Sequence, residues 1–263
     1  MEDEVLRCID SLLSPIDHQK SLERMYILRK QAGYAVALTK IAIHSQISPQ
    51  QRQLASIMLK SFIESNWMNS SDERVQQERL SQIKKEKNEY LSQEDGEEEE
   101  EEVIEAEKVF IIIDEQEKRE LRNLLPQGLS IEERSIQINL SVCLGVVAKY
   151  DYPAQFPNLI SSLKELILSN NTPNITKYGA LVTLEIIIKS DILSDEVLEA
   201  EFTSTNQFFL ELYASTSSPE LKKFCSAIMY SLVYWVFIRK ENKDTENNGI
   251  FSFYLEKLLY FYR

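Results

Sequence analysis

The chain has 263 residues, only 6 glycines and a formal net charge of −13 at pH 7. Ten acidic residues lie between Glu94 and Glu107, and removing these ten from the net charge of −13 leaves −3. Bare nucleic acid does not fit as a direct partner, because phosphate binding requires clustered basic residues, whereas a basic protein does fit. The scarcity of glycine and of strictly alternating polarity predicts helices throughout.

Several sequence features argue against a membrane protein, a metalloprotein or an enzyme. The uncharged stretch 224–238 has 15 residues, fewer than the roughly 20 that span a bilayer, so it predicts a helix buried inside the fold. The 3 cysteines lack a C-x-x-C spacing, which predicts reduced thiols in a cytosolic or nuclear protein. His18 and His44 lack a metal-ligand spacing, and no nucleophile elbow or phosphate-binding loop occurs. The sequence predicts no catalytic residue, no metal and no cofactor.

Serine or threonine followed by proline marks the predicted helix starts at Ser14, Ser48, Thr172 and Ser218. A hydroxyl side chain caps the free N–H groups of a first helical turn, and proline is tolerated at the first helical position. Ser48 and Gln51 also fit a capping box. The predicted helices fall in pairs: 2–13 with 17–31, 33–45 with 49–67, 114–126 with 130–149, 153–169 with 174–190, 195–215 with 219–240, and a last helix at 250–263.

The helical pairs recur every roughly 40 residues, which is the period of HEAT and armadillo repeats. One pair cannot bury its apolar face alone, so neighbouring pairs must stack. We therefore expect an all-α HEAT-repeat superhelix of about five to six repeats. Repeats 1 and 2 are expected over 1–68 and the later repeats over 113–263. The charged segment 69–112 between them is predicted to be a disordered insertion, because like charges repel one another.

The helix predicted at 49–67 carries both an apolar and a polar stripe. Its inward-facing stripe is expected to consist of Leu54, Ile57, Met58 and Ser61. The polar residues spaced by four are expected to form an exposed ridge of Arg52, Ser56, Lys60 and Glu64. The stem of Arg52 has an alternative place against the neighbouring repeat. Trp67 is expected in the core.

Two segments resemble the N-terminal region of β-karyopherins, the importin-β superfamily. Residues 31–67 contain R-x-x-A-x-x-x-L-K at Arg52, Ala55, Leu59 and Lys60, which resembles the importin-β N-terminal domain, although Ser61 stands where that family has asparagine. Residues 151–159 read DYPAQFPNL and resemble a D-W-P-x-x-W-P-x-L corner of these proteins, with other aromatics in place of both tryptophans.

This resemblance implies a nuclear transport receptor that exchanges cargo according to the nucleotide state of the small GTPase Ran. In the family, Ran-GTP lies against the second helices of the first four repeats. These correspond here to 17–31, 49–67, 130–149 and 174–190. The residues that the resemblance implies as Ran contacts are Arg52, Ser56, Lys60, Glu64, Arg134 and Gln137. The resemblance also implies shuttling between cytoplasm and nucleus through nuclear pores.

The acidic run has three interpretations: binding of basic cargo such as histones, modulation of Ran binding by lying over the second helices, or a solvated insertion without a partner. The candidate cargo-binding residues are Glu97, Glu98, Glu99, Glu100, Glu101 and Glu102. The aromatic-rich helices 219–240 and 250–263 are candidates for binding phenylalanine-glycine nucleoporins, with a packed core as the alternative. Two other functions remain open: a HEAT-repeat scaffold without a GTPase partner, and an acidic histone-chaperone-like module.

Overall fold

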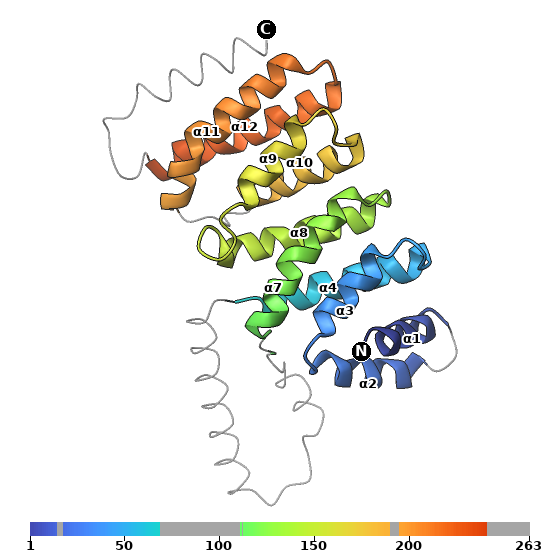
Figure 1. The fold of residues 1–263 in the computed structure, drawn as a ribbon. Helices are drawn as coiled ribbons and strands as arrows, with labels where there is room; N and C mark the ends of the chain where they lie inside the picture. The colour runs from blue at the N-terminus through green and yellow to red at the C-terminus, as the bar shows by residue number, and fades with distance from the viewer. Residues whose placement is uncertain (15–17, 69–110, 112, 190–194, 241–263) are drawn as a thin grey trace, which may run out of the picture. The chain divides into compact units, whose positions relative to one another are not determined.

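The computed structural model in Figure 1 shows a chain built from helices. The structure describes residues 1–14, 18–68, 111, 113–189 and 195–240. Within these residues all regular structure is helical, which confirms the predicted all-α class. The chain divides into two compact units, Met1–Asp151 and Tyr152–Arg263. The acidic run and the predicted helix 250–263 lie outside the described residues, so the predicted boundaries at 69 and 112 stay a prediction.

The first unit consists of helical hairpins that stack in sequence order. Its elements are α1 (Glu2–Leu13), α2 (His18–Arg29), α3 (Tyr34–Ile43), α4 (Pro49–Asn66), α7 (Glu115–Leu124), the 3₁₀ helix η1 (Leu125–Ser130) and α8 (Arg134–Asp151). Helix α1 packs on α2, α3 on α4, and η1 on both α7 and α8. Successive hairpins meet through α3, which contacts α1 and α7, and through α4, which contacts α8. This is the stacking that apolar faces of helical pairs require.

Local sequence explains where these helices begin. Helix α4 starts at Pro49, and Ser48 forms the predicted capping box with Gln51. Helix α8 begins at Arg134, later than predicted, because residues 125–130 form η1, with Pro126 in its first turn. The turn at Gly128 is close-packed, since a Cβ there would lie 2.9 Å from the Cβ of Leu140.

The second unit contains two further hairpins. Its elements are α9 (Leu159–Leu168), α10 (Asn174–Lys189), α11 (Asp195–Ser215) and α12 (Pro219–Lys240). Helix α9 packs on α10, α11 packs on α12, and α10 also contacts α12. Helix α9 begins later than predicted, because the chain first turns through residues 152–158, where the Tyr152–Pro153 bond is cis. Its buried stripe contains Leu159, Leu163 and Ile167.

The uncharged stretch 224–238 lies within α12. In the part of it whose side chains are described, Cys225, Ile228 and Met229 are buried, in agreement with the prediction of a packed helix. None of the helices among the described residues is long and apolar enough to cross a membrane.

Candidate functional site

The described residues that flank segment 69–110 lie close together in the first unit. The Asn66 side chain at the end of α4 accepts a hydrogen bond from the Ile111 backbone N–H at 3.0 Å. Lys118 of α7 donates to the Met68 carbonyl at 2.7 Å. Trp67 is fully buried between these contacts, with the Lys118 ammonium and the Arg122 guanidinium each 5.9 Å from its ring centre. Trp67 therefore has the core position predicted for it.

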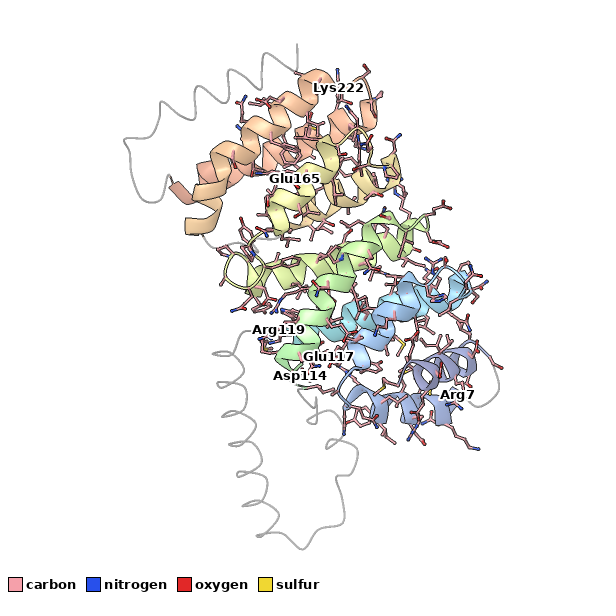
Figure 2. All side chains as sticks on the ribbon, viewed as in Figure 1. Arg7, Asp114, Glu117, Arg119, Glu165 and Lys222 are labelled. Atoms are coloured by element: carbon pink, nitrogen blue, oxygen red, sulfur yellow. The ribbon has the colours of Figure 1, made fainter. Side chains whose placement is uncertain are left out.

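Glu117 of α7 caps the N-terminus of α3, as Figure 2 illustrates with the labelled residue beside that helix. Its carboxylate accepts hydrogen bonds from the backbone N–H groups of Gly33 at 2.8 Å, Ala35 at 3.0 Å and Val36 at 3.3 Å. The first N–H groups of a helix lack internal partners, and its N-terminus attracts negative charge. Sequence analysis missed Glu117: a glycine at the N-cap position, Gly33, shows that no side chain of its own caps α3, but it does not identify the distant partner that does.

The predicted polar ridge on α4 was wrong for two of its four residues, because Arg52 and Ser56 are buried. Arg52 donates from Nε to the Ala42 carbonyl at 3.0 Å, and its Nη1 lies 2.6 Å from Glu133. Ser56 accepts a hydrogen bond from Asn139 of α8 at 3.0 Å. Both residues therefore connect α4 to its neighbours, and the alternative placement of Arg52 against the next repeat is confirmed.

The other candidate contacts differ in accessibility. Gln137 is buried and donates to the Leu129 carbonyl at 2.7 Å, so it fastens α8 to η1. Lys60 is half-buried, and Glu64 and Arg134 are exposed. The Ran contacts expected at these positions stay a prediction. Burial makes Arg52, Ser56 and Gln137 poor contact residues, whereas Lys60, Glu64 and Arg134 remain accessible to a partner.

The stripe of α4 that was predicted to face inward is not the buried side of the helix. Ile57 is 48% exposed, Ser61 is exposed, and Leu54 and Met58 are half-buried. The fully buried apolar residues of this helix are Ala55, Leu59 and Ile63 instead. The open side of α4 is therefore partly apolar, which is typical of a surface that meets another protein.

The second helices of the other hairpins in this unit also expose large apolar side chains. Leu22 and Tyr26 of α2 are 46% and 45% exposed, and Ile138 of α8 is 38% exposed. Together with Ile57 they define the second-helix surface of this unit. Ile27 of α2 is 48% exposed as well. Of the exposed apolar residues, Leu22, Tyr26 and Ile57 lie around one groove, and a contiguous apolar patch is a candidate for contact with another protein.

A groove of about 360 Å³ separates α2 from α4 within this surface. Leu22, Tyr26 and Arg29 line it from α2, and Ile57 and Met58 line it from α4. Cavities of this size accommodate side chains or small ligands. We refer to it as the α2–α4 groove.

Residues 19–93 match the family model of the importin-beta N-terminal domain. The matched segment is less than a third of the chain. The match begins in the first turn of α2 and includes α3, α4 and the residues that line the α2–α4 groove.

Comparison over nearly the whole chain agrees with this domain. Importin-9 of Drosophila melanogaster is 21% identical over 248 residues, which cover 92% of this chain and 21% of importin-9. The structure titled "The exportin Cse1 in its cargo-free, cytoplasmic state" has 16% identity and a TM-score of 0.54, and covers 90% of this chain and 23% of that chain. The structure titled "Kap95:Nup1 complex" has 15% identity and a TM-score of 0.62, and the likeness covers 98% of this chain and 26% of that chain. The chain thus spans about a fifth of the length of importin-9.

These findings confirm the resemblance to the N-terminal region of a β-karyopherin. They also agree with the R-Q-L-A-S-x-x-L-K motif of residues 52–60 and the L-L-P-x-G-L motif of residues 124–129, which resemble importin nine in particular. The structural likeness shows that the fold is of the karyopherin HEAT-repeat type.

All three cysteines of the chain are buried, as free thiols. Burial raises the pKa of the Cys225 thiol to about 12 and that of the Cys143 thiol further. His44 lies just after α3, where its Nδ1 accepts a hydrogen bond from the Gln46 N–H at 3.3 Å. The described residues contain no group of three or more side chains arranged to hold a metal ion.

Proposed function

We propose that the chain is the N-terminal region of a nuclear transport receptor whose second-helix surface binds Ran in its GTP-bound form. The importin-β N-terminal domain over residues 19–93 supports the class of protein. The observation that carries the proposal is the exposure of Leu22, Tyr26, Ile57 and Ile138 along the second helices of one unit. Large apolar residues at the centre of an interface carry most binding energy.

The accessible charges are proposed to surround these apolar contacts. Lys60, Glu64 and Arg134 lie on α4 and α8 beside the apolar residues, and Lys60 and Glu64 are on one face of α4. Charges at the rim of an interface affect orientation and association rate more than affinity. Apolar substitutions on the second helices should therefore weaken binding more than neutralising Lys60 or Arg134.

The direct test is a titration of the chain with Ran loaded with a non-hydrolysable GTP analogue or with GDP. Binding of the GTP form alone is expected, and Ile57→Asp should weaken it by about tenfold or more, which corresponds to loss of an apolar interface anchor. Leu13→Asp is the matched control, because Leu13 is also 48% exposed but lies on the first helix α1. Equal or absent binding of the two nucleotide forms would refute the proposal.

For cargo, we propose that the acidic run Glu97–Glu102 binds basic proteins such as histones. Its support is the concentration of ten carboxylates within 94–107, since clustered negative charge attracts basic proteins and speeds association. Deleting residues 94–107 should lower the affinity for a histone dimer and flatten its salt dependence. An unchanged affinity and salt slope would leave the run as a solvated insertion.

The same proposal includes passage between cytoplasm and nucleus with binding of phenylalanine-glycine nucleoporins. Its support is the structural likeness to Kap95, solved as a complex with Nup1, and the 65% exposure of Tyr230 on α12. The expected observation is capture of the chain by immobilised phenylalanine-glycine repeats and loss of capture with Tyr230→Ser. If neither these repeats nor Ran bind, a HEAT scaffold without a GTPase partner becomes the better description.

A further inference from the structure

A second groove, of about 650 Å³, lies along α12 in the second unit. Apart from Tyr213 of α11, the residues that line it come from one face of α12. They stand four apart in two neighbouring rows, which are Lys222, Ser226 and Tyr230 in the first row and Lys223, Ala227 and Ser231 in the second. We refer to this cavity as the α12 groove.

The α12 groove carries positive charge. Lys222, which is labelled in Figure 2, lies near the start of α12 with its ammonium 5.3 Å from the centre of the Tyr213 ring. Lys223 is exposed. The residues that line the groove include no aspartate or glutamate, so neither charge is compensated within the lining. Two such charges on one face attract a partner of opposite charge.

The other side chains of the α12 groove limit how a ligand is held. The hydroxyl groups of Ser226 and Ser231 donate to carbonyls of α12 itself, so their hydrogens are already used within the helix. Tyr230 is 65% exposed and Tyr213 is half-buried. Tyrosine rings present an apolar surface to a neighbouring side chain. A ligand therefore meets the two ammonium groups as charged contacts and the two rings as apolar contacts.

This face of α12 differs from the face that packs inside the unit. Cys225, Ile228 and Met229 lie on the packed face, and all three are apolar and buried. Lysine and serine are residues that proteins mostly leave exposed. The composition of the α12 groove is therefore that of a surface for a charged partner.

The lining also distinguishes between kinds of anionic partner. Binding of nucleic acid depends on many cations along the phosphates, and the groove has two. Phosphorylated side chains are commonly held by the forked donors of arginine, which the lining lacks. Two carboxylates spaced along a peptide match two separate ammonium groups, and an apolar side chain between them matches the tyrosine rings.

We propose that the α12 groove binds an acidic segment of a partner protein, in which aspartate or glutamate residues flank an aromatic or large apolar side chain. Lys222 and Lys223 pair with the carboxylates, and Tyr213 and Tyr230 contact the apolar side chain. This inference goes beyond the proposed transport function, because it adds a partner opposite in charge to a basic cargo.

Fluorescence anisotropy with a labelled peptide of four glutamates around a central phenylalanine tests this assignment in the full chain. At an ionic strength of about 0.15 M, where screening acts over about 8 Å, combining Lys222→Gln with Lys223→Gln should weaken binding by about tenfold. Tyr230→Ser should weaken it as well. The matched control combines Lys164→Gln with Lys177→Gln, which removes the same charge from α9 and α10 outside the groove. The control should bind the peptide like the wild type.

The remaining outcomes would overturn the assignment. If the wild type does not bind the peptide, or binds a peptide with glutamine in place of every glutamate equally well, the groove does not recognise acidic segments. An equal loss in the control variant would reduce the effect to general charge attraction. A single-stranded oligonucleotide that displaces the peptide and depends on the same two lysines would assign the groove to nucleic acid.

Two further measurements separate this groove from the other proposals. If deletion of residues 94–107 strengthens peptide binding only when both lysines are present, the chain's own acidic run is the occupant, and the assignment to a partner protein is overturned. The variant with both lysines replaced should still bind GTP-loaded Ran and phenylalanine-glycine repeats like the wild type. Loss of either activity in that variant would contradict a separate site for acidic segments.

Discussion

Single residues whose partners lie far along the chain hold the first unit together. Glu117 joins α7 to the start of α3, and Arg122 of α7 donates to the buried carboxylate of Asp151 at the end of α8, at 2.8 Å. The first contact joins helices on either side of the insertion, and the second joins α7 to the end of α8 within the following hairpin. Neither could be read from the sequence, because nothing in helical periodicity identifies a partner that is tens of residues away.

Replacement of Glu117 by alanine should destabilise the first unit by about 2 kcal/mol. The expected loss combines a helix cap, about 1 kcal/mol, with buried N–H groups left without an acceptor. Urea unfolding followed by circular dichroism measures it. Glu120→Ala is the control, because Glu120 makes an exposed salt bridge with Lys40, and such pairs contribute about 0–1 kcal/mol. Equal unfolding free energies for the two variants would contradict the capping role.

The buried Cys143 thiol should make stability fall in alkaline solution. Burial raises its pKa above that of an ordinary thiol, while in the unfolded chain it titrates near about 8.5. Above that pH the unfolded state loses a proton that the folded state keeps, so the free energy of unfolding decreases by about 1.4 kcal/mol per pH unit. Cys143→Ala should lack this component between about pH 9 and 11. Parallel pH profiles of the two proteins would show that the folded thiol ionises normally.

At the scale of the helix, α4 shows what sequence can and cannot establish. The capping box at Ser48 and Gln51 gave its start correctly, because capping is a local interaction. The predicted orientation of α4 was wrong because the helix carries apolar residues on most of its faces. Ile57 lies on its open side and Leu59 on its buried side. Because α4 packs against both α3 and α8, residues over a wide arc of its surface are buried. Polar residues can lie within this arc where they have hydrogen-bond partners in the fold.

The buried position of Arg52 leads to a prediction that separates it from Lys60. Arg52→Met should lower the free energy of unfolding by about 1–3 kcal/mol, because the Ala42 carbonyl and Glu133 lose a charged donor. Lys60→Met should change it by less than about 0.5 kcal/mol, as is usual for surface substitutions. Denaturant unfolding of both variants checks this. A loss as large for Lys60→Met as for Arg52→Met would contradict the assignment of Arg52 to the repeat interface.

For the whole molecule, repeat spacing predicted the architecture better than it predicted any contact surface. The helical pairs, their order and the stacking class follow from apolar stripes that must be buried, and the karyopherin structures share this fold. The residues of the candidate site depend on which face of each second helix is exposed to solvent. Packing between neighbouring repeats decides this exposure, and helical periodicity does not reveal it. We therefore propose the contact on the apolar side of α4, where the sequence led us to expect it on the polar ridge.

The central claim is that the second helices of the first unit form the GTPase-binding surface. Amide hydrogen exchange of the chain, alone and saturated with GTP-loaded Ran, tests it most directly. We predict slower exchange in α2, α4 and α8 with the GTP form and unchanged exchange with the GDP form, because ordered contacts protect the amides beneath them. Unchanged exchange in these three helices, or protection confined to α1, α3 and α7, would contradict the claim.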